Sequence, residues 1–309
     1  MAVKISRAKK NSIKKNKIRD MIDGWLFVLP FVGLALIFFV GPLLVAFMLS
    51  FKEYSFLDSV TMWQAKWVGF NNYINAFKDP TFKKALINTT IYSIGVVPVQ
   101  LVIALALAIV VDSNIKGKTF FRTAYYIPTI TSTVAVAVMF LFIFKTDGLL
   151  NKILVFFGLQ PYNWFNSIHL ALPSIMIMAV WSSVGLYMVI FLAGLQDIPT
   201  SLYEAASIDG ASKWQKLIHV TLPMLKPTIF FNLVVSLIGT FQVFDQAYVV
   251  SKGNGGPLDS TMTVVLYLYR TGFREFKMGY ASAIAFILFV IIFVLTLIQK
   301  KLFGEENRM

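Results

Sequence analysis

The sequence predicts an all-α integral membrane protein with six transmembrane helices. Of the 309 residues, 57% are hydrophobic and only 14% are charged, and the mean hydropathy is +0.71, well above the balance of a soluble globular domain. A helix needs about 20 apolar residues to cross the hydrocarbon core, and a lone span must satisfy its backbone polar groups within itself. Six segments meet this requirement, near residues 25–49, 88–111, 123–144, 172–194, 228–250 and 279–298.

The charges that these six segments exclude support the assignment. None of them contains lysine or arginine, and Asp245, in the fifth segment, is the only acidic residue within any of them. The first apolar run has about 25 residues, against about 7–15 in a cleavable signal peptide, so we expect the first span to be retained.

The basic residues predict that both termini and the loop at residues 195–227 lie in the cytoplasm. The N-terminal tail carries eight lysine and arginine residues, and three smaller groups follow on the same side of the membrane. These four groups hold 17 of the 28 basic residues, at residues 4–19, 116–122, 213–226 and 300–308. This asymmetry is the positive-inside pattern. The net charge of +13 therefore indicates contact with the lipid bilayer rather than with nucleic acid.

Residue types that carry out catalysis or bind metals are sparse. The two histidines, His169 and His219, fall on opposite sides of the membrane in this topology, and the chain has no cysteine. No acid–base partner at a suitable spacing accompanies either histidine. We therefore predict no catalytic, metal-binding or cofactor-binding residue, and we do not expect the chain to be an enzyme.

Polar residues inside the spans predict a path for an uncharged ligand rich in hydroxyl groups. Aromatic rings stack on the apolar face of a sugar, while hydroxyl and amide groups exchange hydrogen bonds with it. The candidate residues are Trp181, Ser183 and Tyr187 in the fourth span, and Asn232, Ser236, Thr240, Gln242 and Asp245 in the fifth.

Two interpretations of these residues stay open. Asn232, Ser236 and Thr240 recur every four residues and so share one face of a helix, where small polar residues can also bind one helix to another. A charged residue in a span costs about 2.5–3.5 kcal/mol, so Asp245 either faces an aqueous path or has a structural role near the outer boundary.

The polar loop at residues 198–227 is more elaborate than a connection between two spans requires. Pro199 suits the first turn of a helix, and Ser201 with Glu204 has the spacing of a capping box. Gly210, which follows Asp209, is expected to end this helix after about two turns.

A second helix is expected in the same loop. Ser212 with Gln215 forms another capping-box pattern, and this helix is expected to end before Pro223. Two short helices at an angle predict that a soluble partner docks here. Glu204 could pair with an arginine of that partner, or it could only cap its own helix.

One motif in this loop has a specific spacing. Glu204-Ala205-Ala206 is followed after three residues by Gly210, and after nine more by Val220-Thr221-Leu222-Pro223. This pattern resembles the EAA loop of ABC importer permeases, in which isoleucine usually stands at the position of Val220.

Other segments resemble the carbohydrate-uptake branch of that family, of the type of the larger maltose permease and the glycerol-phosphate permease. The resemblance covers about residues 24–303. The matching segments are Asp209, Ala211, Phe121-Arg122, Pro128, Lys226-Pro227, Phe241-Gln242-Val243-Phe244-Asp245, Gly255-Gly256-Pro257, Thr261 and Gly279-Tyr280-Ala281-Ser282-Ala283.

The resemblance implies a type I ABC importer permease bundle with a cytoplasmic coupling helix. In such importers an extracytoplasmic solute-binding protein delivers a sugar to two related permease subunits, usually different chains, in a bacterial or archaeal cell membrane. Two cytoplasmic nucleotide-binding subunits bind and hydrolyse ATP-Mg, and the permease itself binds no cofactor. The residues that would transmit this motion are Glu204, Ala205, Ala206, Asp209, Gly210, Leu222 and Pro223.

The same resemblance implies a division of the chain into four parts. They are a basic cytoplasmic tail (1–24), the first transmembrane helix with an extracytoplasmic loop (25–81), the core permease domain (82–299) and a cytoplasmic C-terminal tail (300–309). A neutral mono- or oligosaccharide is the favoured substrate, because a phosphorylated polyol would require arginine or lysine facing the path. The alternative is an ion-coupled secondary transporter, which typically shows inverted repeats or broken helices.

Overall fold

The computed structural model describes residues 21–113 and 116–304. The basic tail at residues 1–24 lies outside the described residues except for its last four, and so does the end of the tail at residues 300–309. The described elements are η1 (Leu36–Val40), α2 (Gly41–Ser50), β1 (Lys52–Glu53), β2 (Lys66–Trp67), α3 (Asn71–Lys78), α4 (Pro80–Asp112), α5 (Lys118–Ile130), α6 (Thr133–Ile143), α7 (Leu149–Phe156), α8 (Ala171–Gln196), α9 (Thr200–Ile208), α10 (Lys213–Lys216), η2 (Leu217–Thr221), α11 (Leu222–Met224), α12 (Lys226–Phe241), α13 (Asp245–Ser251), η3 (Pro257–Asp259), α14 (Val264–Tyr269), η4 (Arg270–Arg274) and α15 (Met278–Gly304).

The membrane-spanning helices largely follow the prediction. Among the described residues, the helices long and apolar enough to cross a membrane are Met21–Ser50, Pro80–Asp112, Ala171–Gln196, Lys226–Ser251 and Met278–Phe303. The pair α5 and α6 makes a sixth span if its two halves count as one.

The third span differs in shape from the single helix expected at residues 123–144. Its halves α5 and α6 are bent by 96° with respect to each other. At the bend, Thr131 and Ser132 have extended ψ angles of 141° and 128°. Pro128 has no N–H group to continue the helical hydrogen bonds. At the end of α5, the Thr131 N–H group bonds to the carbonyl of Pro128, and the Thr131 hydroxyl donates to the carbonyl of Ile127 at 2.9 Å.

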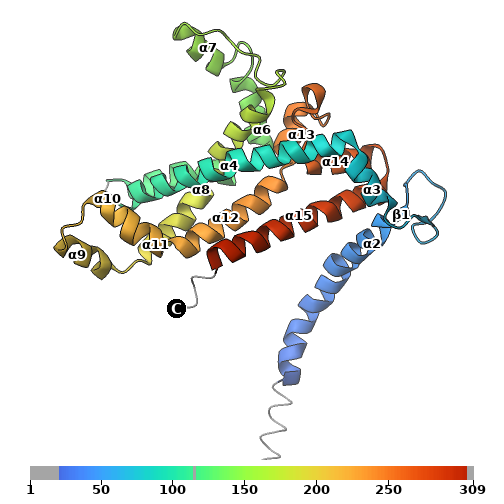
Figure 1. The fold of residues 1–309 in the computed structure, drawn as a ribbon, viewed down its shortest axis with the longest axis horizontal. Coiled ribbons are helices and arrows are strands. Elements are labelled where there is room, and N and C mark those ends of the chain that lie inside the picture. The colour runs from blue at the N-terminus through green and yellow to red at the C-terminus, as the bar shows by residue number, and fades with distance from the viewer. Residues whose placement is uncertain (1–20, 114–115, 305–309) are drawn as a thin grey trace, which may run out of the picture.

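The core of the molecule is a bundle in which α4 packs along α8 and α12, and α12 packs against α15 (Figure 1). The end of the bundle that carries residues 197–225 is called the loop end here, and the opposite end, with residues 51–79 and 252–277, the far end. Two clusters of buried hydrophobic side chains fill the bundle, one toward each end. On α4 they meet between Val96 and Val97.

The first span leaves this bundle. Residues 21–50 lead away from the other helices, and no residue in their most apolar window is buried (Figure 1). Contact with the bundle is made near the end of this span, where the ring of Phe47 packs edge to face on Phe286 at 5.0 Å. Most of the span therefore presents apolar side chains to its surroundings.

Two helices continue through a proline by widening the preceding turn. The helix that starts after Ser212 was expected to end before Pro223, but α10, η2 and α11 run on to Met224. In an α-helix the proline ring clashes with the carbonyl four residues earlier. In the π turn of η2, the Leu222 N–H group bonds to the Leu217 carbonyl. This wider turn changes the position of the carbonyl four residues before Pro223, with which the proline ring would otherwise clash. A π turn, η1, likewise precedes Pro42 in the first span.

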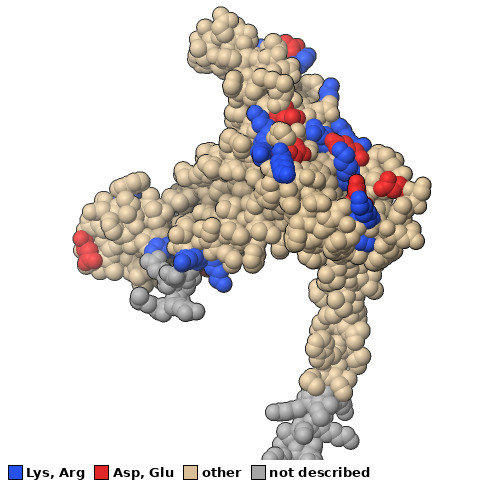
Figure 2. All heavy atoms as spheres, turned by 45° about the vertical axis from the view of Figure 1, so that its right-hand side comes forward, with Lys and Arg blue, Asp and Glu red and all other residues tan. Residues whose placement is uncertain are grey.

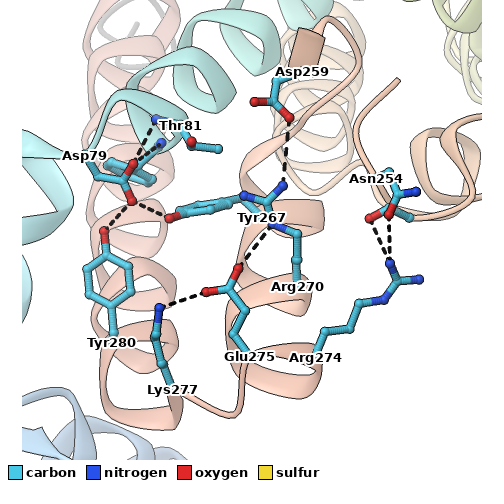
Figure 3. Close-up of polar contacts among 12 residues, drawn as sticks. Asp79, Thr81, Asn254, Asp259, Tyr267, Arg270, Arg274, Glu275, Lys277 and Tyr280 are labelled. Carbon is cyan, nitrogen blue, oxygen red and sulfur yellow. Dashed lines mark hydrogen bonds and ion pairs between the residues drawn. The ribbon is translucent and has the colours of Figure 1, made fainter. Parts of the chain in front are cut away.

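Charged side chains gather at the two ends of the bundle, and the visible surface between them is uncharged (Figure 2). At the far end, Glu275 pairs with Arg270 at 3.5 Å and with Lys277 at 3.0 Å, and Arg270 also lies 3.8 Å from Asp259 (Figure 3). An uncharged belt between charged ends is the surface that a bilayer requires.

A carboxylate joins three segments at the far end. Asp79 caps α4 by accepting a hydrogen bond from the Thr81 N–H group at 2.8 Å, and it also accepts the hydroxyls of Tyr267 and Tyr280 (Figure 3). Burial alone would raise the pKa of Asp79, but these bonds together with one from Phe82 hold the pKa below its usual value. Burial and the bond to Asp79 raise the pKa of Tyr267 to about 12. Asp79 thus fastens α14 and α15 to the start of α4.

We expect Gly185→Val to destabilise the bundle. A Cβ atom at Gly185 in α8 would overlap the carbonyl of Tyr125 in α5, so the two helices would have to separate. Overpacking of this kind costs about 1–3 kcal/mol, which would lower the apparent melting temperature in detergent. Gly33→Ala is the control, because a Cβ atom at that position would have no neighbour within 4 Å. Equal melting temperatures for both variants would contradict the close α5–α8 contact.

We expect Asp79→Ala to lower stability by about 1 kcal/mol at pH 7, the typical value for loss of a helix cap. Because the folded-state pKa of Asp79 is depressed, its contribution is present above the unfolded pKa and is lost as the pH falls through the folded pKa. The difference in melting temperature from wild type should therefore shrink below about pH 4. Asp147→Ala, at an exposed carboxylate 3.2 Å from Lys145, should change little at any pH. A deficit independent of pH would contradict the ionised cap.

Candidate functional site

A polar cavity of about 250 Å³ lies where the two hydrophobic clusters meet. Its walls come from α4, α8 and α12 and from the segment that follows α12. Six of the eight residues predicted for a ligand path line it: Ser183, Tyr187, Ser236, Thr240, Gln242 and Asp245.

The other two predicted path residues lie elsewhere. Trp181 lines a separate, apolar cavity of about 700 Å³ between α4, α5 and α8, and its ring packs 5.6 Å from that of Phe140. Positions 181 and 183 are two residues apart and therefore point to different faces of α8. Asn232 is fully buried one helical turn from Ser236, on the loop side of the cavity.

Gln100 of α4 connects the polar residues of three helices. Its Nε2 atom donates to the hydroxyl of Ser236 on α12, and its Oε1 atom accepts the hydroxyl of Ser183 on α8. The side chain is only 2% exposed. Gln100 was not predicted from the sequence, although an amide in the middle of the apolar run at residues 88–111 was the available signal.

A second set of bonds extends the network toward the far end. The hydroxyls of Ser93 and Thr240 lie 2.8 Å apart, and the Tyr92 hydroxyl donates to Oε1 of Gln246 at 2.9 Å. Ser236 and Thr240 therefore bind helices together and line the cavity at the same time. The hydrogen bonds therefore confirm that the stripe binds helices together, and its role in a ligand path stays a prediction.

The backbone of the fifth span is unwound at the cavity. α12 ends at Phe241 and α13 begins at Asp245, with Gln242 and Phe244 in non-helical conformations. Non-helical backbone at membrane depth is tolerated where it is buried in protein or lines a cavity. This break leaves Gln242 and Asp245 exposed in the cavity wall.

The charge of the lining is informative. Asp245 is the only carboxylate in the lining, which contains no lysine or arginine. The remaining polar groups are hydroxyls and amides, which suit a neutral, hydroxyl-rich ligand better than an anion. Among the described residues, no group of three or more His, Asp or Glu side chains could hold a metal ion.

The loop between α8 and α12 forms two short helices joined by a sharp bend, as predicted. Gly210 has a φ of +77°, and the N–H group of Ala211 bonds to the carbonyl of Ala206 at 2.9 Å, which is the geometry of a Schellman motif. Both bonds of the predicted capping box at Ser212 and Gln215 are present. The bend therefore follows from the local sequence.

The predicted capping box at Ser201 is wrong. α9 begins at Thr200, two residues earlier than a cap at Ser201 would place it, with Pro199 as its N-cap. Ser201 therefore lies inside the first turn, and no side chain caps the helix. Glu204 therefore does not cap its own helix. Its side chain is exposed, as is that of Ala205 beside it.

Hydrogen bonds hold the loop helices together. Lys216 donates to the hydroxyl of Ser207 at 2.6 Å, and the hydroxyls of Tyr203 and Thr221 lie 3.0 Å apart. Ala206, Asp209 and Gly210 border a hollow of about 380 Å³ between α9 and α10.

Two of the predicted coupling residues lie outside α9 and the bend that follows it. Leu222 and Pro223 belong to α11, which leads through the fully buried Leu225 directly into α12. The loop and the helix that carries Ser236 and Thr240 are thus continuous in the chain.

Comparison with known proteins identifies the family of this chain. The family model "Binding-protein-dependent transport system inner membrane component" matches residues 100–303. The chain is 41% identical over 296 residues to the probable ABC transporter permease protein YesP of Bacillus subtilis (strain 168), covering 95% of this chain and 93% of the relative. It is 38% identical over 284 residues to the arabinooligosaccharides transport system permease protein AraP of the same organism, covering 91% and 88%.

The fold is shared with a solved importer. A chain in the crystal structure of a bacterial alginate ABC transporter, in complex with alginate pentasaccharide-bound periplasmic protein, superimposes with a TM-score of 0.79. The match covers 93% of this chain and 95% of that chain at 24% sequence identity. The matched family and the similar permeases place the bundle among transport permeases rather than enzymes. The chain belongs to the family of binding-protein-dependent transport system inner membrane components, the membrane-embedded permease subunits of ABC importers.

Proposed function

We propose that this chain is one of two permease subunits of an ATP-driven importer, and that it moves a neutral mono- or oligosaccharide delivered by an extracytoplasmic solute-binding protein. The observation that carries the proposal is a polar cavity inside the bundle, lined by α12, the same helix that continues from the exposed EAA-type loop.

The chemistry of the cavity favours a neutral sugar. Hydroxyl and amide groups dominate its polar lining, and a carboxylate at Asp245 would repel an acidic saccharide. The name of the relative AraP, 38% identical, assigns arabinooligosaccharides to that protein and so supports this substrate class.

A second, related permease subunit would complete the site. The volume of the cavity is about 250 Å³, whereas a complete ligand pocket typically has a volume of about 300–1,000 Å³. Within the described part of the chain, no residue in the most apolar window of residues 21–50 is buried, and a partner subunit would cover these side chains.

We place the loop end in the cytoplasm, together with both termini, in a bacterial or archaeal cell membrane. Lys213, Lys216 and Lys226 lie on that end, and Lys300 and Lys301 lie beside it, since Phe303 packs 6.2 Å from Phe230 at the start of α12. The basic residues of the N-terminal tail support the same orientation.

Two nucleotide-binding subunits would bind and hydrolyse ATP-Mg, and this chain would bind no cofactor. Glu204, Ala205 and Ala206 on α9 would contact one of these subunits. The Schellman bend and the bonds of Lys216 and Tyr203 make the loop a rigid unit, so its motion would pass through α11 into α12 as a tilt of packed helices.

A bent span is also a feature of the alternative, an ion-coupled secondary transporter. α5 and α6 form such a span. Membership of the ABC importer permease family nevertheless favours ATP as the energy source, and dependence of uptake on ATP separates the two mechanisms.

We expect Gln100→Leu to reduce the rate of sugar uptake by about tenfold, because it removes the bonds that position Ser183 and Ser236, each worth about 1–3 kcal/mol when lost in a buried site. The assay uses the assembled importer in proteoliposomes with ATP inside and a panel of neutral saccharides, arabinotriose included. Gln160→Leu, at an exposed residue outside the cavity, is the control. Unchanged uptake by Gln100→Leu would limit the network to helix packing.

We expect Glu204→Lys to abolish ATP-driven uptake and to release the nucleotide-binding subunits during purification in detergent, while the level of the chain in the membrane stays normal. Reversing an exposed charge at a docking surface replaces attraction with repulsion. Asp147→Lys makes the same reversal at an exposed carboxylate far from the loop and should leave both properties intact. Normal transport by Glu204→Lys would remove the coupling role of the loop.

A further inference from the structure

Asn232 is the unsatisfied member of the polar stripe on α12. It is 0% exposed, and neither its Nδ2 nor its Oδ1 atom has a hydrogen-bond partner. Ser236 and Thr240, one and two turns away, are bonded to Gln100 and Ser93. Each buried unpaired polar group costs about 1–3 kcal/mol. An uncompensated amide is therefore a feature that packing alone does not explain.

The surroundings of Asn232 offer no partner for its amide. On the face of α4 that carries Gln100, the next residues toward the loop end are Ala104 and Ala108, both 0% exposed. On α8, Tyr187 lies one turn from Ser183 toward the loop end, and its hydroxyl makes no hydrogen bond to Asn232. Toward the loop end, the face of α4 that carries Gln100 is thus apolar beyond the cavity, and Asn232 is the member of the stripe on α12 that lies past the cavity lining.

We propose that Asn232 is the next hydrogen-bonding position for the sugar on the loop side of the cavity, sealed in the arrangement seen here and uncovered when α12 tilts away from α4. The proposal rests on the import function proposed above and adds the route that the sugar takes after it leaves the cavity.

The geometry supports this order of events. Asn232 lies on the same face of α12 as two residues that line the cavity, one turn closer to the loop end. The small side chains of Ala104 and Ala108 let the helices pack closely when the route is shut. Separation of α12 from α4 would expose the amide first to water and sugar, which would supply the missing bonds. An amide that is unpaired in one state and paired in another biases the equilibrium between them.

The absence of cysteine from the whole sequence makes this proposal testable by thiol labelling. Asn232→Cys would be assembled into the complete importer and treated with a small, positively charged methanethiosulfonate reagent, without nucleotide and with ATP plus vanadate. We expect labelling of this chain to be about tenfold or more faster in one condition than in the other, because the residue is fully buried in the closed arrangement. Equal rates in both conditions, whether fast or slow, would overturn the proposal.

Two further cysteine variants calibrate the assay. Ala283→Cys, fully buried in α15, should stay protected in both conditions, and Gln160→Cys, at an exposed residue outside the cavity, should be labelled in both. If the wild type imports sugar with ATP while position 232 gives equal rates in both conditions, the further inference fails and the proposed function stands. If uptake needs no ATP, the proposed function fails whatever the labelling shows.

A second variant tests the unpaired amide directly. Asn232→Leu has a similar shape and removes both unsatisfied atoms, so the melting temperature of the importer should be equal to or higher than that of the wild type. A residue with a purely structural bond, to protein or to a bound water, would give the opposite result. A melting temperature several degrees lower would overturn the proposal, because it would mean that the amide has a partner in the closed arrangement.

Discussion

The two-ended hydrogen bonding of Gln100 is the constraint on which the rest of the bundle depends. Between helices in a bilayer there is no hydrophobic driving force to select one relative position, so polar contacts and close packing set the register. One amide that both donates to α12 and accepts from α8 fixes α4, α8 and α12 at the same depth. The hydrophobic clusters on either side meet at that depth, and the polar cavity lies where they meet.

The same contact explains why the cavity residues are hydroxyls and amides rather than charges. Each polar group of the cavity needs a hydrogen-bond partner inside the protein when no ligand is bound. A hydroxyl has one donor and two acceptor sites, so it can bond a neighbouring helix and still offer a hydrogen bond to the cavity. Ser236 and Thr240 do both. A lysine or arginine at these positions would carry a positive charge, and Asp245 is the only carboxylate in the lining that could balance it.

Local sequence was sufficient for the features that local bonds determine. The positions of the spans, the bend at Gly210 and the capping box at Ser212 all follow from residues within a few positions of one another. The features that could not be predicted depend on distant partners or on unusual turns. Periodicity showed a polar face on α12 but not that Gln100 would meet it, and it did not reveal the π turn that lets a helix pass Pro223.

The uncovered first span has a consequence for how the protein is made. Residues 21–50 emerge from the ribosome first and depend on the later helices only near Phe47. They can insert into the membrane as an independent unit, well before α4 meets α12. If two permease subunits pair as proposed, a chain without its partner would leave a long apolar helix exposed in the lipid, by which membrane proteases could distinguish it from assembled copies.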